Sequence, residues 1–126
     1  MAPQPSNFGA YIGLSEYDAL DDKVVVRLPV KRRHLNQMGL VHGGAIATLV
    51  DNSMGIACLK LAGRPLVTVE FKVNFVRPAH KGTLTGTSYV YKKGEHLAFT
   101  ECDVTDEGGV LIAKAFGIYM LVESRP

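Results

Sequence analysis

The feature that most constrains the fold is one long apolar segment that begins at His42-Gly43-Gly44 and ends near Ala62. Lys60 in its last turn, Gly63 directly after it and Pro65 two residues further on are typical of a helix end. We therefore predict one helix of about 18 residues, roughly 27 Å long. Apolar side chains occupy most of its circumference, so we expect other elements to cover it on nearly every side.

The rest of the chain predicts the strands that provide this cover. Residues 67–75 alternate strictly between apolar and polar side chains, the pattern of a strand with one face in the core. Residues 24–30 predict a second strand, and a weak one is expected near residues 14–20. Three more are expected at residues 83–92, 96–106 and 110–122. Short glycine-containing turns separate them, which favours antiparallel hairpins. The sequence thus predicts an α+β fold, an antiparallel sheet wrapped around one long central helix.

Length, composition and charge limit the class of protein. The 126 residues suffice for a single domain, residues 1–126, and the net charge of +2 gives no basic excess of the kind that nucleic-acid binding needs. Cys58 and Cys102 form no CxxC pair and the four histidines are scattered, so no metal site is expected. Asp51 inside the apolar segment argues against a membrane span. The first residues show no basic region followed by an apolar one, so we do not expect a secretory signal. We therefore expect a cytoplasmic protein with reduced thiols that binds neither nucleic acid nor membrane.

The entrance of the predicted helix suits a carbonyl oxygen that acquires negative charge. The first N–H groups of a helix lack an intrahelical acceptor and lie at the positive end of its dipole. Gly43 and Gly44 place no side chain between these groups and a ligand. A tight entry into the helix is the simpler explanation of the two glycines. The long polar loop from Lys31 to Val41 and the downstream Asp51 favour a functional site.

Asp51 is the second candidate, because an ionised carboxylate in an apolar helix costs several kcal/mol unless it is partnered. It belongs to one polar stripe with Thr48, Asn52 and Gly55. Asp51 lies eight residues beyond Gly43, which is roughly 12 Å along the helix. If both residues serve one reaction, the aspartate must therefore come from a second chain. A twofold dimer with antiparallel helices would create two identical sites.

The run NQMGLVHGG at residues 36–44, followed by LVDN at residues 49–52, resembles the signature of hotdog-fold acyl-CoA thioesterases of the PaaI-like group. The resemblance covers the chain from about Phe8 to Val122. It implies the hotdog fold and homodimers that often pair again into tetramers. It also implies hydrolysis of an acyl- or aryl-acyl-CoA to the free acid and CoA, with no cofactor beyond the CoA of the substrate.

By position, the resemblance implies a role for each motif residue. The Gly43 amide would polarise the thioester carbonyl, and Asn36 would help to hold the acyl end. Asp51 of the opposite subunit would act on water as a general base, or attack directly as a nucleophile. Thr68 stands where related enzymes carry Ser or Thr to position the water or the aspartate. His42 would contribute shape and backbone rather than act as an acid.

The resemblance also implies two segments that bind the CoA moiety, where Arg and Lys suit its phosphates. They are the turn Arg77, Pro78, Ala79 and His80 and the hairpin Lys92, Lys93 and Gly94.

Two alternatives remain open from the sequence. One is a hotdog hydratase or dehydratase, in which His42 and Asp51 would move the protons. The other is a protein that binds acyl-CoA without catalysis, which would gain nothing from a buried carboxylate.

Overall fold

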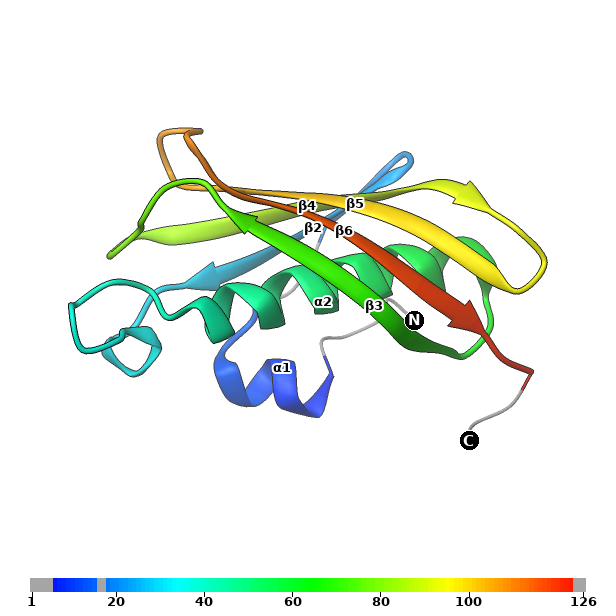
Figure 1. The fold of residues 1–126 in the computed structure, drawn as a ribbon, viewed down its shortest axis with the longest axis horizontal. Coiled ribbons are helices and arrows are strands. Elements are labelled where there is room, and N and C mark those ends of the chain that lie inside the picture. The colour runs from blue at the N-terminus through cyan, green and yellow to red at the C-terminus, as the bar shows by residue number, and fades with distance from the viewer. Residues whose placement is uncertain (1–5, 16–17, 124–126) are drawn as a thin grey trace.

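A computed structural model describes residues 6–15 and 18–123. The helices are α1 (Asn7–Ile12) and α2 (Gly43–Ala62), and η1 (Arg32–His34) is a 3-10 turn. The strands are β1 (Asp18–Leu20), β2 (Lys23–Pro29), β3 (Leu66–Phe75), β4 (Thr83–Lys93), β5 (Leu97–Thr105) and β6 (Leu111–Leu121). They form one sheet in the order β1-β2-β4-β5-β6-β3, in which every neighbouring pair is antiparallel. Figure 1 shows this sheet curved over α2, with α1 on the opposite side of the helix.

The core lies between the sheet and the side of α2 that faces it. Leu49, Val50 and Met54 of the helix are fully buried there, together with Leu28 and Leu84 from the sheet. The helix ends as predicted, because Gly63 adopts the left-handed conformation (φ 66°) and its N–H donates to the Leu59 carbonyl. The predicted α+β architecture, an antiparallel sheet on one long helix, is confirmed. The longer predicted strands lie within one or two residues of the observed ones.

The helix is covered on fewer sides than predicted. The sheet packs on one side of α2, and α1 is the only described element that contacts the opposite side. Asp51 and Asn52 are consequently half-buried, and Leu59 and Leu61 near the helix end are exposed. A sheet of six strands curls over the helix without closing around it, so the polar stripe remains accessible. By length and composition alone α2 could cross a membrane, yet half of that span is buried inside this fold.

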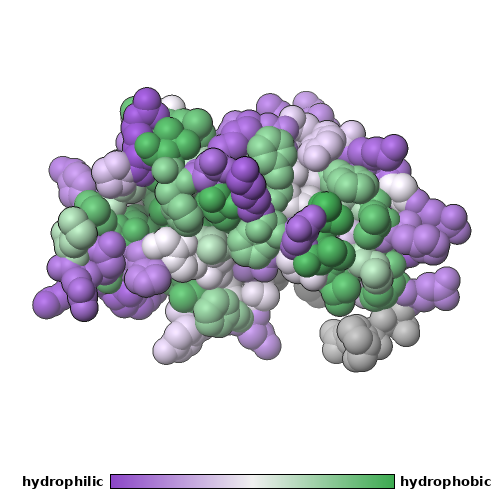
Figure 2. Space-filling model, in the orientation of Figure 1, coloured by the Kyte–Doolittle hydropathy of each residue, from purple (hydrophilic) through white to green (hydrophobic). Residues whose placement is uncertain are grey.

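The prediction that residues 67–75 place one face in the core holds only in part. Val73 packs against the core, whereas Val69, Phe71 and Phe75 are 51%, 37% and 55% exposed. The reason is that β3 is the last strand of the sheet and pairs with β6 alone, so much of it extends past the helix. Figure 2 shows apolar patches on the face along which β3 runs. Edge strands with exposed apolar side chains are surfaces for pairing with another chain.

The N-terminal part differs from the prediction in detail. The weak strand expected at residues 14–20 is reduced to the three residues of β1, and residues 16–17 lie outside the described residues. The lead-in forms α1, which is fixed to α2 because the Ser6 hydroxyl donates to Asn52 Oδ1 at 2.9 Å. The buried His34 ring then ties the loop before α2 to α1. Its Nδ1 accepts from the Lys31 N–H at 2.8 Å, and its Nε2 donates to the Ile12 carbonyl at 2.5 Å.

Candidate active site

The N-terminus of α2 presents one unused backbone donor. The His42 ring caps the helix, because its Nδ1 accepts from the Gly44 N–H at 2.8 Å. The His42 carbonyl accepts from the Ala45 N–H at 2.9 Å. The Gly43 N–H has no acceptor among the described residues. This amide is therefore free to donate to a ligand at the positive end of the helix.

The Asn36 side chain completes this end of the site. Its Oδ1 accepts from the Met38 and Leu40 N–H groups at 2.9 and 3.1 Å, which folds the loop before the helix. Within the described part of the chain its Nδ2 donates to nothing, so this second donor is also available. A cavity of about 310 Å³, which we call the Gly43 cavity, is bordered by both groups. Its lining is Asn36, Leu40, Val41, Gly43, Ile46, Phe75, Val76, Arg77, Pro78 and Ala79.

Asp51 lies two turns further along α2 at a second, larger cavity of about 560 Å³, which we call the Asp51 cavity. Its polar end is formed by Ser6, Asp51, Asn52, Thr68 and Tyr119, and its apolar part by Gly55, Ile56, Leu59, Pro65 and Leu66. The Thr68 hydroxyl donates to Asp51 Oδ1 at 3.1 Å, and the Tyr119 hydroxyl donates to the same oxygen at 2.8 Å. Oδ2 receives no hydrogen bond from any described residue. One carboxylate oxygen is thus fixed and the other is open.

Tyr119 is the residue of this site that the sequence analysis missed. It lies on β6, is 1% exposed and is 68 residues from its partner in the chain. Burial, and then the charge and hydrogen bond of Asp51, raise the pKa of Tyr119 above its ordinary value of 10. A signal did exist in the sequence. Tyr119 continues the inward-facing positions of Ala113, Ala115 and Gly117, and a buried tyrosine hydroxyl needs a partner.

The structure does not bring Asp51 and Gly43 together within one chain. They line different cavities, eight residues apart on α2, a separation of roughly 12 Å. The Gly43 cavity has the two free N–H donors of Gly43 and Asn36, and the Asp51 cavity has a carboxylate with one open oxygen.

The two predicted CoA-binding segments lie in different places. Arg77, Pro78 and Ala79 line the Gly43 cavity, and His80 lines the adjoining hollow together with Pro78 and Ala79. The Arg77 guanidinium also donates to the Leu111 carbonyl at 3.0 Å. The buried Ala79 accepts at its carbonyl from the Val41 N–H, so this turn is part of the framework of the site.

The hairpin with Lys92, Lys93 and Gly94 lies at the other end of the sheet and lines neither cavity. The Gly94 N–H donates to the Leu97 carbonyl at 2.7 Å and closes the β4–β5 turn. Both lysines are exposed. Within one chain, therefore, this segment is separate from the Gly43 cavity.

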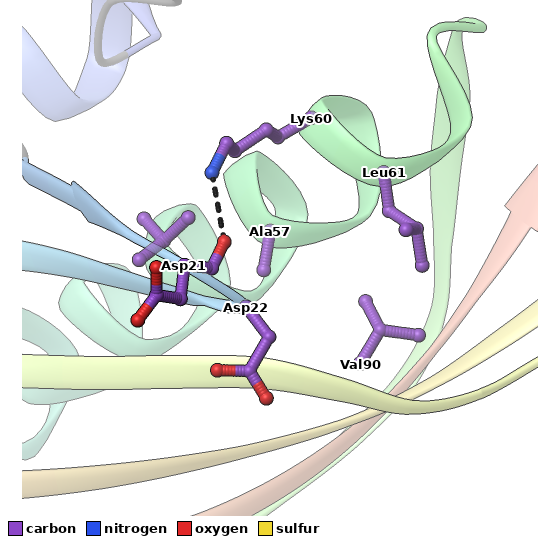
Figure 3. A pocket seen from close by; sticks show the side chains of 7 residues that line it. Asp21, Asp22, Ala57, Lys60, Leu61 and Val90 are labelled. Atoms are coloured by element: carbon purple, nitrogen blue, oxygen red, sulfur yellow. Dashed lines mark hydrogen bonds between the residues drawn. The ribbon is translucent and has the colours of Figure 1, made fainter.

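A third cavity, of about 220 Å³, lies at the far end of α2 between the β1–β2 turn and β4 (Figure 3). Lys60 lines it, and its ammonium donates to the Asp21 carbonyl at 3.2 Å. Asp22, Ala57, Leu61 and Val90 also line it, and it contains none of the predicted site residues.

Comparison with known proteins gives consistent matches. The family model of the thioesterase superfamily matches residues 38–113. Acyl-coenzyme A thioesterase 13 from Homo sapiens is 37% identical over 113 residues, which are 86% of this chain and 80% of that protein. The conserved protein PA5202 from Pseudomonas aeruginosa has a structure with a TM-score of 0.87 and 32% identity, covering 93% of this chain and 94% of that one. The PaaI protein from the phenylacetic acid degradation operon of E. coli shares the fold, with a TM-score of 0.86 at 23% identity, over 93% and 85% of the two chains.

Proposed function

The chain belongs to the thioesterase superfamily as a hotdog-fold thioester hydrolase of the PaaI-like group, and from this premise we propose that it hydrolyses acyl-CoA at sites shared between two subunits. Gly43 and Asn36 of one subunit receive the thioester carbonyl, and Asp51 of the other activates water. The observation that carries the proposal is the division of donors and carboxylate between two separate cavities of one chain.

The geometry of β3 supports a twofold arrangement. Its first part borders the Asp51 cavity through Leu66 and Thr68, and its last residue, Phe75, borders the Gly43 cavity. If the exposed edge of β3 pairs antiparallel with the same edge of a second copy, the beginning of one strand lies beside the end of the other. This pairing brings each Asp51 cavity next to the partner's Gly43 cavity. It also covers the exposed apolar side chains of the strand.

With Asp51 as the general base, the reaction proceeds through one tetrahedral intermediate. Water transfers a proton to Asp51, its oxygen bonds to the thioester carbon, and the carbonyl oxygen becomes an anion that accepts from the Gly43 N–H and Asn36 Nδ2. Collapse of the intermediate breaks the C–S bond, and the CoA thiolate takes up the proton held by Asp51 and leaves as the thiol, which regenerates the carboxylate. A fixed amide donor lowers the barrier by roughly 3–4 kcal/mol, and general-base assistance adds about a hundredfold or more.

The lining of the two cavities suggests how the substrate lies. The apolar part of the Asp51 cavity, with Ile56, Leu59 and Leu66, suits the acyl group. The CoA part then extends past Arg77 and His80 of the partner, whose side chains suit its phosphates. Lys92 and Lys93 lie at the end of the sheet away from the Gly43 cavity of their own chain. They can therefore contact CoA only if it is bound at a Gly43 cavity of another subunit.

The alternative functions fit the geometry less well. A hydratase needs a His42 ring that is free to move a proton, yet the ring is engaged as the helix cap through Nδ1, which accepts from the Gly44 N–H. A protein that only binds acyl-CoA has no use for a carboxylate with one open oxygen at an apolar cavity.

We also propose that these dimers pair into tetramers and that the protein acts in the cytoplasm without a cofactor. Exposed Tyr91, Phe116 and Met120 on the sheet give an apolar surface for the second dimer. Cys58 and Cys102 are both free and buried, as in a protein with reduced thiols. Light scattering after size exclusion measures the assembly, and a monomer at assay concentration contradicts the shared site.

The test is an acyl-CoA panel in which released thiol is measured for short, medium and aryl thioesters. We expect Asp51→Asn to fold normally and to lose most of kcat, while the matched control Asp22→Asn, a carboxylate in an exposed turn, keeps full activity. Near-normal turnover by Asp51→Asn refutes the assignment. A change in enoyl absorbance without thiol release indicates hydration instead. Single turnover in H₂¹⁸O separates the two roles of Asp51, since ¹⁸O enters its carboxylate only if it is the nucleophile.

A further inference from the structure

The contact between Tyr119 and Asp51 carries an inference about the carboxylate itself, and this inference rests on the proposed function. The Tyr119 hydroxyl lies 2.8 Å from Asp51 Oδ1 and 3.1 Å from the backbone carbonyl oxygen of the same residue. We propose that Tyr119 is a positioning residue that fixes Asp51 by Oδ1 and by its backbone, so that Oδ2 is the oxygen that takes the proton from water.

Packing fixes the tyrosine ring in this position. Gly55 and Gly117 both lie against the ring. A Cβ added at Gly117 would lie 3.0 Å from Tyr119 Cε2 and 2.8 Å from Met54 Cε, which is too close for a real side chain. A Cβ at Gly55 would lie 3.7 Å from Tyr119 Cε1. The ring therefore occupies space that a side chain at Gly117 of β6 would otherwise fill.

The second donor comes from the adjacent strand. Thr68 on β3 is the ladder partner of Tyr119 on β6, and both hydroxyls donate to Asp51 Oδ1. The register of the two strands shifts between Thr68 and Glu70, directly after this pair. Such irregularities change the direction of side chains at strand edges. Two donors on one oxygen hold the plane of the carboxylate and leave the lone pairs of Oδ2 for water.

The hydroxyl acts as a permanent donor and not as an acid. Because burial and the Asp51 charge raise the pKa of Tyr119 above its ordinary value of 10, the phenol keeps its proton at neutral pH. Its contribution is therefore expected in the orientation of Asp51 and not in proton transfer to the leaving group.

The test compares Tyr119→Phe with Tyr89→Phe. Tyr89 also donates its hydroxyl to a carboxylate, Glu101 Oε2 at 2.7 Å, but neither residue lines the Asp51 or the Gly43 cavity. For Tyr119→Phe we expect kcat to fall roughly ten- to a hundredfold, the effect of one hydrogen bond to a charged group, with KM within about twofold and the fold retained. Tyr89→Phe should keep both constants.

A double-mutant comparison tests whether the loss of kcat in Tyr119→Phe arises through Asp51. If Tyr119 acts only through Asp51, adding Tyr119→Phe to Asp51→Asn causes no further loss of the residual rate. A rise in KM with unchanged kcat, wild-type kcat in Tyr119→Phe, or an equal loss in both backgrounds overturns the inference.

NMR tests the contact between Tyr119 and Asp51 independently of activity. If no acyl-CoA is hydrolysed, the proposed function is refuted, but the positioning of Asp51 by Tyr119 can still be tested in this way. The buried hydroxyl proton should give a low-field NMR resonance, assigned by its loss in Tyr119→Phe and distinguished from that of Tyr89 by Tyr89→Phe. We expect Asp51→Asn to move it to higher field. A resonance that does not respond to Asp51→Asn overturns the positioning role.

Discussion

Substitution of Gly43 by alanine separates the chemistry of the helix entrance from its structural role. A Cβ at Gly43 would lie 3.4 Å from Phe75 Cζ and 3.6 Å from Cε1, which are ordinary contacts. Alanine in the first helical turn also loses less backbone entropy on folding than glycine does, which raises the free energy of unfolding by about 0.5–1 kcal/mol. We therefore expect the melting temperature of Gly43→Ala to equal or exceed that of the wild type.

Activity should change in the opposite direction. The new methyl group projects into the Gly43 cavity beside the free amide and displaces the thioester carbonyl from it. Complete loss of one oxyanion donor costs roughly 3–4 kcal/mol of barrier, or about 10² to 10³ in kcat. We expect Gly43→Ala to lose at least about tenfold in kcat/KM, because displacement removes much of that interaction.

Thermal unfolding and thiol release from acyl-CoA are measured on the same preparation. Gly108→Ala, in the exposed β5–β6 turn, is the control for the effect of an added methyl group on stability, because its Cβ would contact only Asp106 Oδ1 at 3.5 Å. A Gly43→Ala protein that is stable and fully active shows that the glycine serves only a tight entry into the helix. A protein that fails to fold shows that the space beside Phe75 is smaller than the structure indicates.

Three further predictions follow from individual contacts. His42→Ala should lose the cap of α2 and about 1 kcal/mol of unfolding free energy in denaturant titration, and His42→Asn should restore it; equal loss in both contradicts the capping role. A hydrogen bond from Lys114 lowers the pKa of Glu101, so its stabilisation is present above the ordinary value of 4.5 and is lost as the pH falls through the lowered pKa. Lys114→Met should therefore lose less stability than the wild type when the pH falls from 5 to 3, as measured by thermal melts. Melting temperatures that fall in parallel with pH in the two proteins refute this. Burial raises the pKa of the Cys58 thiol to about 12 and that of Cys102 to about 11, so neither should react with a disulfide reagent before unfolding; rapid native labelling contradicts their burial.

The helix could be predicted from the sequence because both of its ends are local signals. The N-cap at His42 and the left-handed Gly63 depend on residues within one turn of the helix. The position of β3 could not be predicted in this way. Its alternation of apolar and polar residues is the same whether its apolar face lies in the core or is exposed for contact with another chain. The order of the strands depends on pairings between distant segments, such as β3 with β6.

The same distinction applies to the site. Gly43 and Asp51 stand out from their own sequence surroundings, one by its place at a helix entrance and the other by its charge in an apolar segment. Tyr119 does not, since its partner is 68 residues away and only the sheet brings them together. Asn36 was expected to hold the acyl end, but the structure adds that its Oδ1 folds the loop through the Met38 and Leu40 amides.

The most direct test of the shared site is complementation between two inactive chains. One carries Asp51→Asn. The other carries Asn36→Asp, which keeps an acceptor for the Met38 and Leu40 amides but replaces the free donor by an oxygen that repels the oxyanion. Each homodimer then lacks one half of both sites.

After subunit exchange in an equal mixture, about half of the dimers contain both chains, and each of these has one intact site. The mixture should therefore show about a quarter of the wild-type kcat per chain. Native mass spectrometry verifies the exchange. Recovery of that activity is the result that sites shared across the β3 edge predict, and a mixture that exchanges fully yet stays inactive contradicts them.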